Sequence, residues 1–335
     1  MIFQHKRLTP QIVFCLAVCV FIPFFALASD EINSRALSRY IMAVMYDDLG
    51  DLDTAIQEYK KALSLDYKNS LIHLGLAASQ IKKGEFPRAI EELKLAARFD
   101  PEAIEPHAIL ALLYSSQNKL DLATGEYEIA LRNASKLQPK NIEIYKTLGA
   151  IYLQQKKYKE AENAYKLILD LSPNDAEAHF YLANIYDELK DRAKAEAELK
   201  NALELKPDYH QALNYLGYLY VEENRNLETA ETMIRKALEM EPDNGAYVDS
   251  LGWLYFKKGK IQEALRELER ASVLLEDPVI YEHLGDVYFK TGDYNNAKLN
   301  WQKSLRLEPN KDVVKNKIEA LNRKSTIDEK AKSAK

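Results

Sequence analysis

Residues 142–175 read IEIYKTLGAIYLQQKKYKEAENAYKLILDLSPND, and this stretch decides the fold. Counted from Ile142, its anchor residues fall at positions 4, 7, 8, 11, 20, 24 and 32: Tyr145, Leu148, Gly149, Tyr152, Ala161, Tyr165 and Pro173. The same anchors return with a period near 34 residues across residues 36–311. A period of this length predicts an array of stacked helical units, each of which buries its apolar face against the next.

Small side chains recur at two positions of every copy. Position 8 holds Ala43, Ala77, Ala111, Gly149, Ala183, Gly217, Gly252 and Gly285. Position 20, allowing for small shifts, holds Ala55, Ala89, Ala123, Ala161, Ala195, Ala230, Ala264 and Ala297. We expect two helices of one copy to touch there, because a larger side chain would force them apart.

Two further positions punctuate the copies. Position 11 is Tyr in seven of them, and Gln80 is the exception. The turn inside each copy holds a residue that tolerates a left-handed backbone, with lysine in two copies: Gly50, Gly84, Asn118, Lys156, Lys190, Asn224, Gly259 and Gly292. The spacing changes by about four residues near 133–136, by one near Arg225 and by one near Asp277, and we place all three changes in loops.

These anchors resemble the tetratricopeptide-repeat (TPR) signature, a helix–turn–helix unit. The resemblance implies an all-α fold, a right-handed TPR superhelix (α-solenoid) of about eight repeats with a C-terminal capping helix. The expected repeats are 36–69, 70–103, 104–141, 142–175, 176–209, 210–244, 245–277 and 278–311. Residues 312–324, with Val314, Ile318 and Leu321 on one face, are the expected cap, and the Lys-rich residues 325–335 the expected disordered tail.

Residues 1–28 have the composition of a secretory signal peptide. Lys6 and Arg7 precede an apolar run that ends in Ala26-Leu27-Ala28, so we expect cleavage before Ser29 and a periplasmic or secreted protein. The alternative is an uncleaved N-terminal helix that anchors the chain.

Composition and motifs argue against catalysis and against nucleic-acid binding. The two cysteines both lie in the leader, at Cys15 and Cys19, so the rest of the chain has no thiolate nucleophile or cysteine metal site. Loss of Lys6 and Arg7 leaves 44 basic against 51 acidic side chains, a net charge of −7 that does not suit a nucleic-acid surface. No phosphate loop, His-Glu-x-x-His or Gly-x-Ser-x-Gly is present. We expect no enzyme, no cofactor and no metal.

We expect the regularly placed histidines and carboxylates to have structural rather than catalytic or metal-binding roles. His73, His107 and His179 all stand at position 4, a packing position of the TPR signature, and successive copies cannot converge on one metal ion. Carboxylates such as Glu196 and Glu198 follow helix surfaces, and we expect them on a solvated face.

The first helix of each TPR repeat lines a concave groove, and the resemblance implies that positions 2, 5, 6, 9, 12 and 13 face it. In the second and third repeats these positions hold mostly small or aliphatic side chains, such as Leu74, Ala78, Ala108 and Leu112. From the fifth repeat onward they combine rings with amides and carboxylates, which suits an extended peptide, since Asn can pair with both backbone N–H and C=O. The expected peptide-binding residues are Tyr181, Asn184, Asn214, Tyr218, Asp249, Trp253 and Asp286.

The partner is expected to be a protein or peptide segment that is neutral or basic. Cytosolic TPR co-chaperones clamp a C-terminal carboxylate with Lys and Arg, and this chain has Asn, Tyr, Asp and Glu at the matching positions. Residues 247–309 resemble bacterial envelope TPR adaptors of secretion, pilus assembly or polysaccharide export, which implies association with an envelope membrane complex. A structural module for self-association or docking, with an empty groove, is the alternative.

Overall fold

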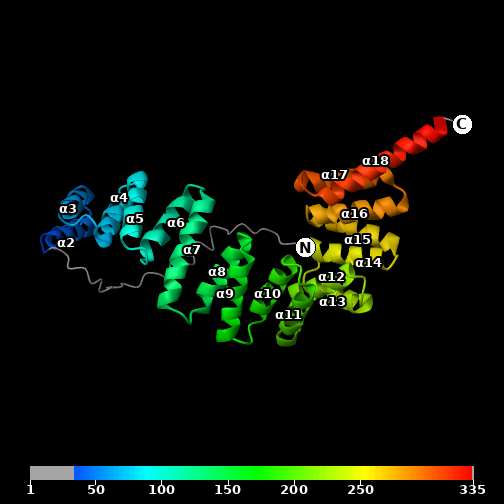
Figure 1. The fold of residues 1–335 in the computed structure, drawn as a ribbon, viewed down its shortest axis with the longest axis horizontal. Helices are drawn as coiled ribbons and strands as arrows, with labels where there is room; N and C mark the ends of the chain where they lie inside the picture. Colours follow the sequence, from blue (N-terminus) through cyan, green and yellow to red (C-terminus); the bar gives the residue numbers. More distant parts are fainter. Residues whose placement is uncertain (1–33, 334–335) are drawn as a thin grey trace. The chain divides into compact units, whose positions relative to one another are not determined.

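The computed structural model describes residues 34–333, with side chains as far as Arg323. Every regular element among these residues is an α-helix, which confirms the all-α fold class. The helices follow one another as hairpins and divide after Leu171 into two compact units (Figure 1). The predicted leader lies outside the described residues, and none of the described helices is long and apolar enough to cross a membrane.

The first unit consists of four helical hairpins. Its helices are α2 (Ser34–Asp48), α3 (Leu52–Leu65), α4 (Ser70–Lys82), α5 (Phe86–Phe99), α6 (Glu105–Ser116), α7 (Leu120–Leu137), α8 (Ile142–Gln154) and α9 (Tyr158–Leu171). The change of spacing near 133–136 does not fall in a loop. It lengthens α7 instead, and the Asn133 side chain in its last turns donates to the Pro101 carbonyl at 2.9 Å.

The second unit consists of four hairpins and a final single helix. Its helices are α10 (Ala176–Glu188), α11 (Arg192–Leu205), α12 (His210–Glu222), α13 (Leu227–Met240), α14 (Gly245–Lys257), α15 (Ile261–Leu274), α16 (Pro278–Thr291), α17 (Tyr294–Leu307) and α18 (Asp312–Ser333). The extra residue near Arg225 lies in the α12–α13 connection, where Asn226 takes a left-handed backbone with φ of 51°.

The small residues at positions 8 and 20 lie where the two helices of a hairpin approach most closely. A Cβ on Gly217 would stand 2.8 Å from a side-chain carbon of Ile234, and one on Gly252 would stand 2.7 Å from Leu268. Ala195 and Ala230 at position 20 are fully buried. This contact confirms the reason given above for the small residues, because an added carbon at these distances must displace its neighbour.

The predicted turn residues all have positive φ. Lys156 and Lys190 adopt 58° and 65° although they carry a Cβ, and Gly50 and Gly292 adopt 81° and 84° at equivalent places. The left-handed residue lets the chain reverse between the first and second helix of each repeat.

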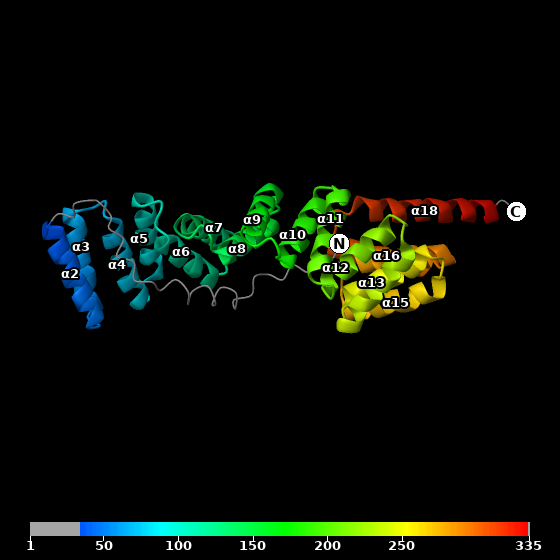
Figure 2. The same cartoon turned by 90° about the horizontal axis from the view of Figure 1, so that it is seen from below.

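α18 covers the last hairpin, as the capping prediction requires, but it is longer than predicted. Val314 is fully buried and Leu321 nearly so, and both pack with Ile318 against Ala297 and Trp301 of α17. The helix continues to Ser333, and Figure 2 shows it extending as one straight element. The sequence predicts a disordered tail from Ser325, whereas the structure continues the helix over 325–333, a stretch free of Gly and Pro.

Position 4 histidines and the carboxylates of the second helices form hydrogen-bonded pairs. His73, His107 and His179 each place Nδ1 2.6 Å from a glutamate nineteen residues later, namely Glu92, Glu126 and Glu198. The histidines thus join the two helices of their own repeat, which agrees with a structural role. It also means that Glu198 does not lie on a merely solvated face.

Glu196 departs from the same expectation. Its carboxylate accepts hydrogen bonds from Arg225 at 2.6 Å and from the Tyr220 hydroxyl at 3.0 Å, and it pairs with Lys200 at 2.9 Å. Partial burial opposes ionisation, but these donors outweigh it and lower the pKa of Glu196 to about 2. The charge pattern of the helix could not show that donors from the next repeat converge on this carboxylate.

Candidate peptide-binding groove

The candidate site lies on α10, α12, α14 and α16, the first helices of the repeats in the second unit. We call the side chains at positions 2, 5, 6, 9, 12 and 13 of these helices the groove surface. Their small neighbours at position 8 allow close packing of the hairpins, so the groove side chains of successive repeats come into contact with one another.

Trp253 lies at the centre of this surface but is almost fully buried. Its ring stacks on His283, with ring centroids 3.9 Å apart and planes 8° from parallel, and on Phe256 at 4.9 Å. Its indole Nε1 donates to Glu222 at 2.7 Å, and the Lys257 ammonium lies 5.0 Å from the ring centroid. Trp253 therefore joins α12, α14 and α16 and is 8% exposed.

Asp249 is paired as well. It is fully buried, and both carboxylate oxygens lie 3.0–3.1 Å from Nδ1 of His283. A buried carboxylate is tolerated when a partner such as this ring donates to it. The contact between Asp249 and His283 thus joins α14 to α16.

Asn184 and Tyr181 lie on α10. The Asn184 amide donates to the carbonyl of Phe180 at 2.7 Å within the same helix, and the side chain is 2% exposed. Tyr181 is half-buried, and its ring meets Phe180 edge-on at 5.6 Å. Asn184, Asp249 and Trp253, which the sequence predicts to contact a peptide, thus bond through their polar groups to partners within the protein.

Asn214 and Tyr218, one turn apart on α12, are different. Oδ1 of Asn214 is buried and finds no hydrogen-bond donor among the described residues. Burial raises the pKa of the Tyr218 hydroxyl well above its usual value, and the carboxylates of Glu222 and Asp249 act in the same direction. Tyr218 therefore stays a neutral donor and acceptor at any physiological pH.

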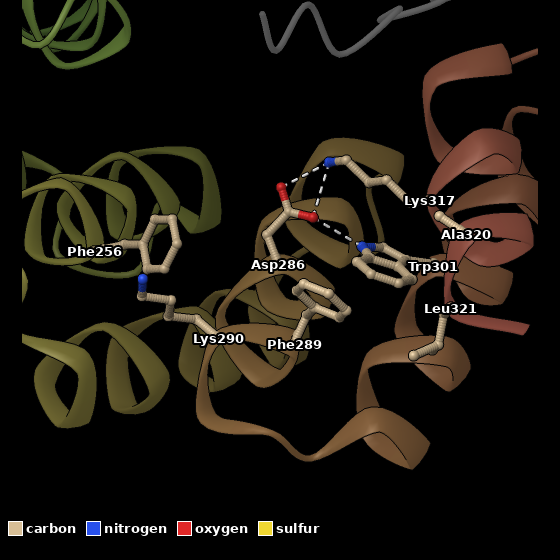
Figure 3. A pocket seen from close by; sticks show the side chains of 8 residues that line it. All are labelled: Phe256, Asp286, Phe289, Lys290, Trp301, Lys317, Ala320 and Leu321. Carbon is tan, nitrogen blue, oxygen red and sulfur yellow. Dashed lines mark hydrogen bonds and ion pairs between the residues drawn. The ribbon is translucent and has the colours of Figure 1, made fainter. Parts of the chain in front are cut away.

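Asp286 stands at one wall of a pocket of about 520 Å³ (Figure 3). Its carboxylate accepts the indole N–H of Trp301 at 2.9 Å and pairs with Lys317 of α18 at 2.7 Å. Most other walls are apolar, as the complete lining shows: Phe256, Asp286, Phe289, Lys290, Trp301, Lys317, Ala320 and Leu321. Phe256, Asp286, Phe289 and Lys290 stand at groove positions 12, 9, 12 and 13, so the pocket belongs to the groove surface.

Lys317 of α18 and Lys311, which directly precedes that helix, balance the carboxylates at this end. Lys317 also reaches Glu282 at 2.6 Å, and Lys311 reaches the second Glu282 oxygen at 2.9 Å. Burial alone would raise the pKa of Glu282, but the two ammonium groups outweigh it and hold the pKa below its usual range. The net negative charge of the groove surface at α16 is therefore smaller than the sequence of that helix indicates.

Sequence reasoning missed three partners that organise the site. His283 stands at groove position 6 and could have been included by the same register, whereas Trp301 and Lys317 lie on α17 and α18, outside that register. The packing of α17 and of α18 brings them to Asp286.

The repeated hairpins, close contacts at positions 8 and 20 and a groove surface on the first helices define a TPR protein, an α-solenoid that binds other proteins. The family model described as "Cilia and flagella-associated protein 70 C-terminal domain" matches residues 26–246 and, in a second placement, 104–321. The chain belongs to this family of TPR domains, and folds of this class are generally interaction scaffolds rather than enzymes.

Relatives and solved structures agree on the repeat architecture. The type IV pilus assembly protein PilF of Pseudomonas aeruginosa is 30% identical over 105 residues, which cover 31% of this chain and 38% of PilF. The BBSome complex member BBS4 of Bos taurus is 23% identical over 165 residues, covering 47% of this chain and 31% of BBS4. The chain thus spans about a third of the length of these relatives. The crystal structure of the APC/C hetero-tetramer Cut9-Hcn1 superposes with a TM-score of 0.53 at 17% identity, covering 87% of this chain and 70% of that one.

Proposed function

We propose that this protein is an exported adaptor of the bacterial cell envelope that holds a peptide segment of a partner on the groove surface. The observation that carries the proposal is the largely apolar pocket of about 520 Å³, to which four groove positions contribute. Pockets of this volume accommodate large side chains, and aromatic walls make them anchoring points for a partner.

Within this proposal the seven predicted residues have two kinds of role. Asn214, Tyr218 and Tyr181 contact the segment, because the buried Asn214 carbonyl needs a donor such as a peptide N–H. Asn184, Asp249 and Trp253 hold the surface in shape through their partners on α10, α12 and α16. Asp286 fixes the wall of the pocket through Trp301 and Lys317.

The charge of the surface supports a neutral or basic segment near α12. Glu222 lies beside Tyr218 there, and its carboxylate accepts a hydrogen bond from the neutral indole N–H of Trp253, which leaves its negative charge unbalanced. At α16 the Lys317 ammonium already pairs with Glu282 and Asp286, so a basic partner gains most at α12.

An envelope location is supported by the leader pattern of residues 1–28 and by the similarity to a type IV pilus assembly protein. We propose a role in secretion, pilus or polysaccharide-export assembly. N-terminal sequencing of protein purified from the envelope should give Ser29. Recovery of an intact Met1, with extraction only by detergent, would instead support the anchored form.

Capture from envelope extract tests the groove itself. Immobilised wild-type chain should retain a partner that the Tyr218→Phe and Phe289→Ala variants retain poorly, while Glu239→Ala, at an exposed position of α13, should retain it fully. If the groove variants capture the partner as well as wild type and an outer-face variant fails, the groove mechanism is wrong.

One observation favours the second candidate, a docking or self-association module. Leu37, Ile41 and Met45 stand four residues apart on one face of α2 and are 38%, 49% and 58% exposed. Light scattering that finds a dimer in wild type and a monomer in Ile41→Ser would favour this reading over the first.

A further inference from the structure

At position 11 the second repeat lacks the aromatic ring that the other repeats have. Seven copies have Tyr there, and in several of them the hydroxyl meets a charged side chain on the second helix of the preceding repeat. Tyr255 accepts from Arg235, Tyr220 donates to Glu196 at 3.0 Å, and Tyr288 donates to Glu269 at 2.5 Å. The rings of Tyr114, Tyr220 and Tyr255 are buried, and these residues are 4–6% exposed.

Gln80 stands where the second repeat should have this ring. A pocket of about 400 Å³ is present at that place. Its lining residues come from α3, α4 and α5: Lys60, Gln80, Pro87, Arg88, Glu91 and Glu92. Lys60 precedes Gln80 by the same twenty residues that separate Lys94 from Tyr114 and Arg235 from Tyr255. The pocket therefore lies where the phenol ring of a position 11 tyrosine would be, and Lys60 is the cation that such a hydroxyl would meet.

The polar groups of this pocket need a ligand. Gln80 is 2% exposed, yet its Oε1 has no hydrogen-bond partner among the described residues. Leaving such a buried acceptor unmet is unfavourable. Arg88, Glu91 and Glu92 are already engaged with Glu85, Lys94 and His73.

We propose that this pocket binds a phenolic ring, which takes the place that tyrosine has in the other repeats. The phenol hydroxyl donates to Oε1 of Gln80 and accepts from the Lys60 ammonium, and the ring lies against Pro87. The ring can come from a free small phenol or from a tyrosine side chain of another protein. The site is independent of the groove surface, because all of its residues belong to the first unit.

Titration of the full chain with p-cresol, followed by ¹H–¹⁵N NMR, tests the site. The Gln80 side-chain amide, assigned from its absence in Gln80→Tyr, should shift in a saturable way. Toluene, which lacks the hydroxyl, should bind roughly tenfold more weakly because it forms neither hydrogen bond. N-acetyl-tyrosinamide distinguishes the sources: comparable binding points to a protein tyrosine, and binding of p-cresol alone points to a free phenol.

Gln80→Tyr supplies the ring from the chain itself and should abolish the p-cresol response while raising the melting temperature. Gln262→Tyr makes the same exchange at an exposed position of α15, outside the groove surface, and should leave the response unchanged. Equal binding of toluene and p-cresol, an undiminished response in Gln80→Tyr, or no response in wild type would each overturn the proposal.

Discussion

The two units share one scaffold but differ in what their first helices present. In the first unit the groove positions hold aliphatic side chains such as Leu37, Leu71 and Leu112, which are 37–44% exposed. In the second unit they hold rings and carboxylates that bond across repeats, as Trp253 does to Glu222 and Tyr215 does to Asp187 at 2.9 Å. The repeat signature fixes the hairpin, and the chemistry of the surface is set by the positions that the signature leaves open.

This difference has a consequence for stability as well as for binding. A repeat array is held by contacts between neighbours, so a tie between first helices strengthens the interface of two repeats. The second unit has such ties at the groove itself, and changes there should affect folding and recognition together. The first unit has a tie of this kind, from Asp47 of α2 to Ser79 and Lys82 of α4. A change at one of its aliphatic groove positions should affect neither folding nor recognition strongly.

Asp249→Ala should produce the largest loss. It removes the partner of the buried His283 ring, which should cost about 3–5 kcal/mol in the free energy of unfolding. Urea unfolding measures it. Leu112→Ala, at a groove position of the first unit, should cost less than half as much. Equal losses would mean that the ties of the second unit do not distinguish it.

Gly217→Leu should cost as much as about 3 kcal/mol, because even its Cβ would meet Ile234 at 2.8 Å. The matched control is Gly125→Leu in α7 of the first unit, where nothing lies within 4 Å of an added Cβ. That variant should be neutral or slightly stabilising, since a helix-interior glycine is replaced. Thermal melts that rank the two variants the other way would contradict the repeat register.

Phe289→Ala should weaken partner binding by about 2 kcal/mol, because it removes an aromatic wall of the groove pocket. Phe289 is 40% exposed, so the fold should tolerate this change better than truncation of Trp253. Calorimetry with the captured partner measures the effect, and Leu71→Ala in the first unit is the control. Loss of binding in Leu71→Ala, with Phe289→Ala unaffected, would move the binding surface to the first unit.

The fold was predictable because its determinants are local and repeated. Gly149, Ala161 and Pro173 recur at fixed spacing, and each reports on a contact or turn within one repeat. The length of α7 and of α18 was not predictable in the same way. Residues 133–136 and 325–333 contain no Gly or Pro, and spacing alone does not tell whether an added segment extends a helix or forms a loop.

The candidate site was predictable as a set of positions but not as a set of interactions. The register placed Asp249 and Trp253 on the groove helices correctly, yet their partners His283 and Glu222 come from other repeats. Whether a groove side chain faces a ligand or a neighbour depends on the distance between repeats, which is set by packing. Gln80 is the opposite case, since a single departure from the signature marks a place where packing leaves space.

The smallest effect concerns Glu196, which links two repeats of the second unit through Arg225. The pKa of Glu196 in the folded protein is about 2, below its ordinary value of 4.5, so the folded state binds its proton less readily than the unfolded state. The stabilisation is therefore complete above pH 4.5 and is lost as pH falls toward 2.

Arg225→Gln should cost about 1 kcal/mol in the free energy of unfolding at pH 7, and the difference in that free energy from wild type should shrink steadily between pH 4.5 and 2.5. Lys157→Gln, which removes the corresponding pair with Glu128 at 2.8 Å in the first unit, provides the comparison. Urea unfolding at a series of pH values measures both. A difference between wild type and Arg225→Gln that persists unchanged to pH 2.5 would show that Arg225 acts through its stacking on Tyr220, 4.5 Å away, rather than through the Glu196 carboxylate.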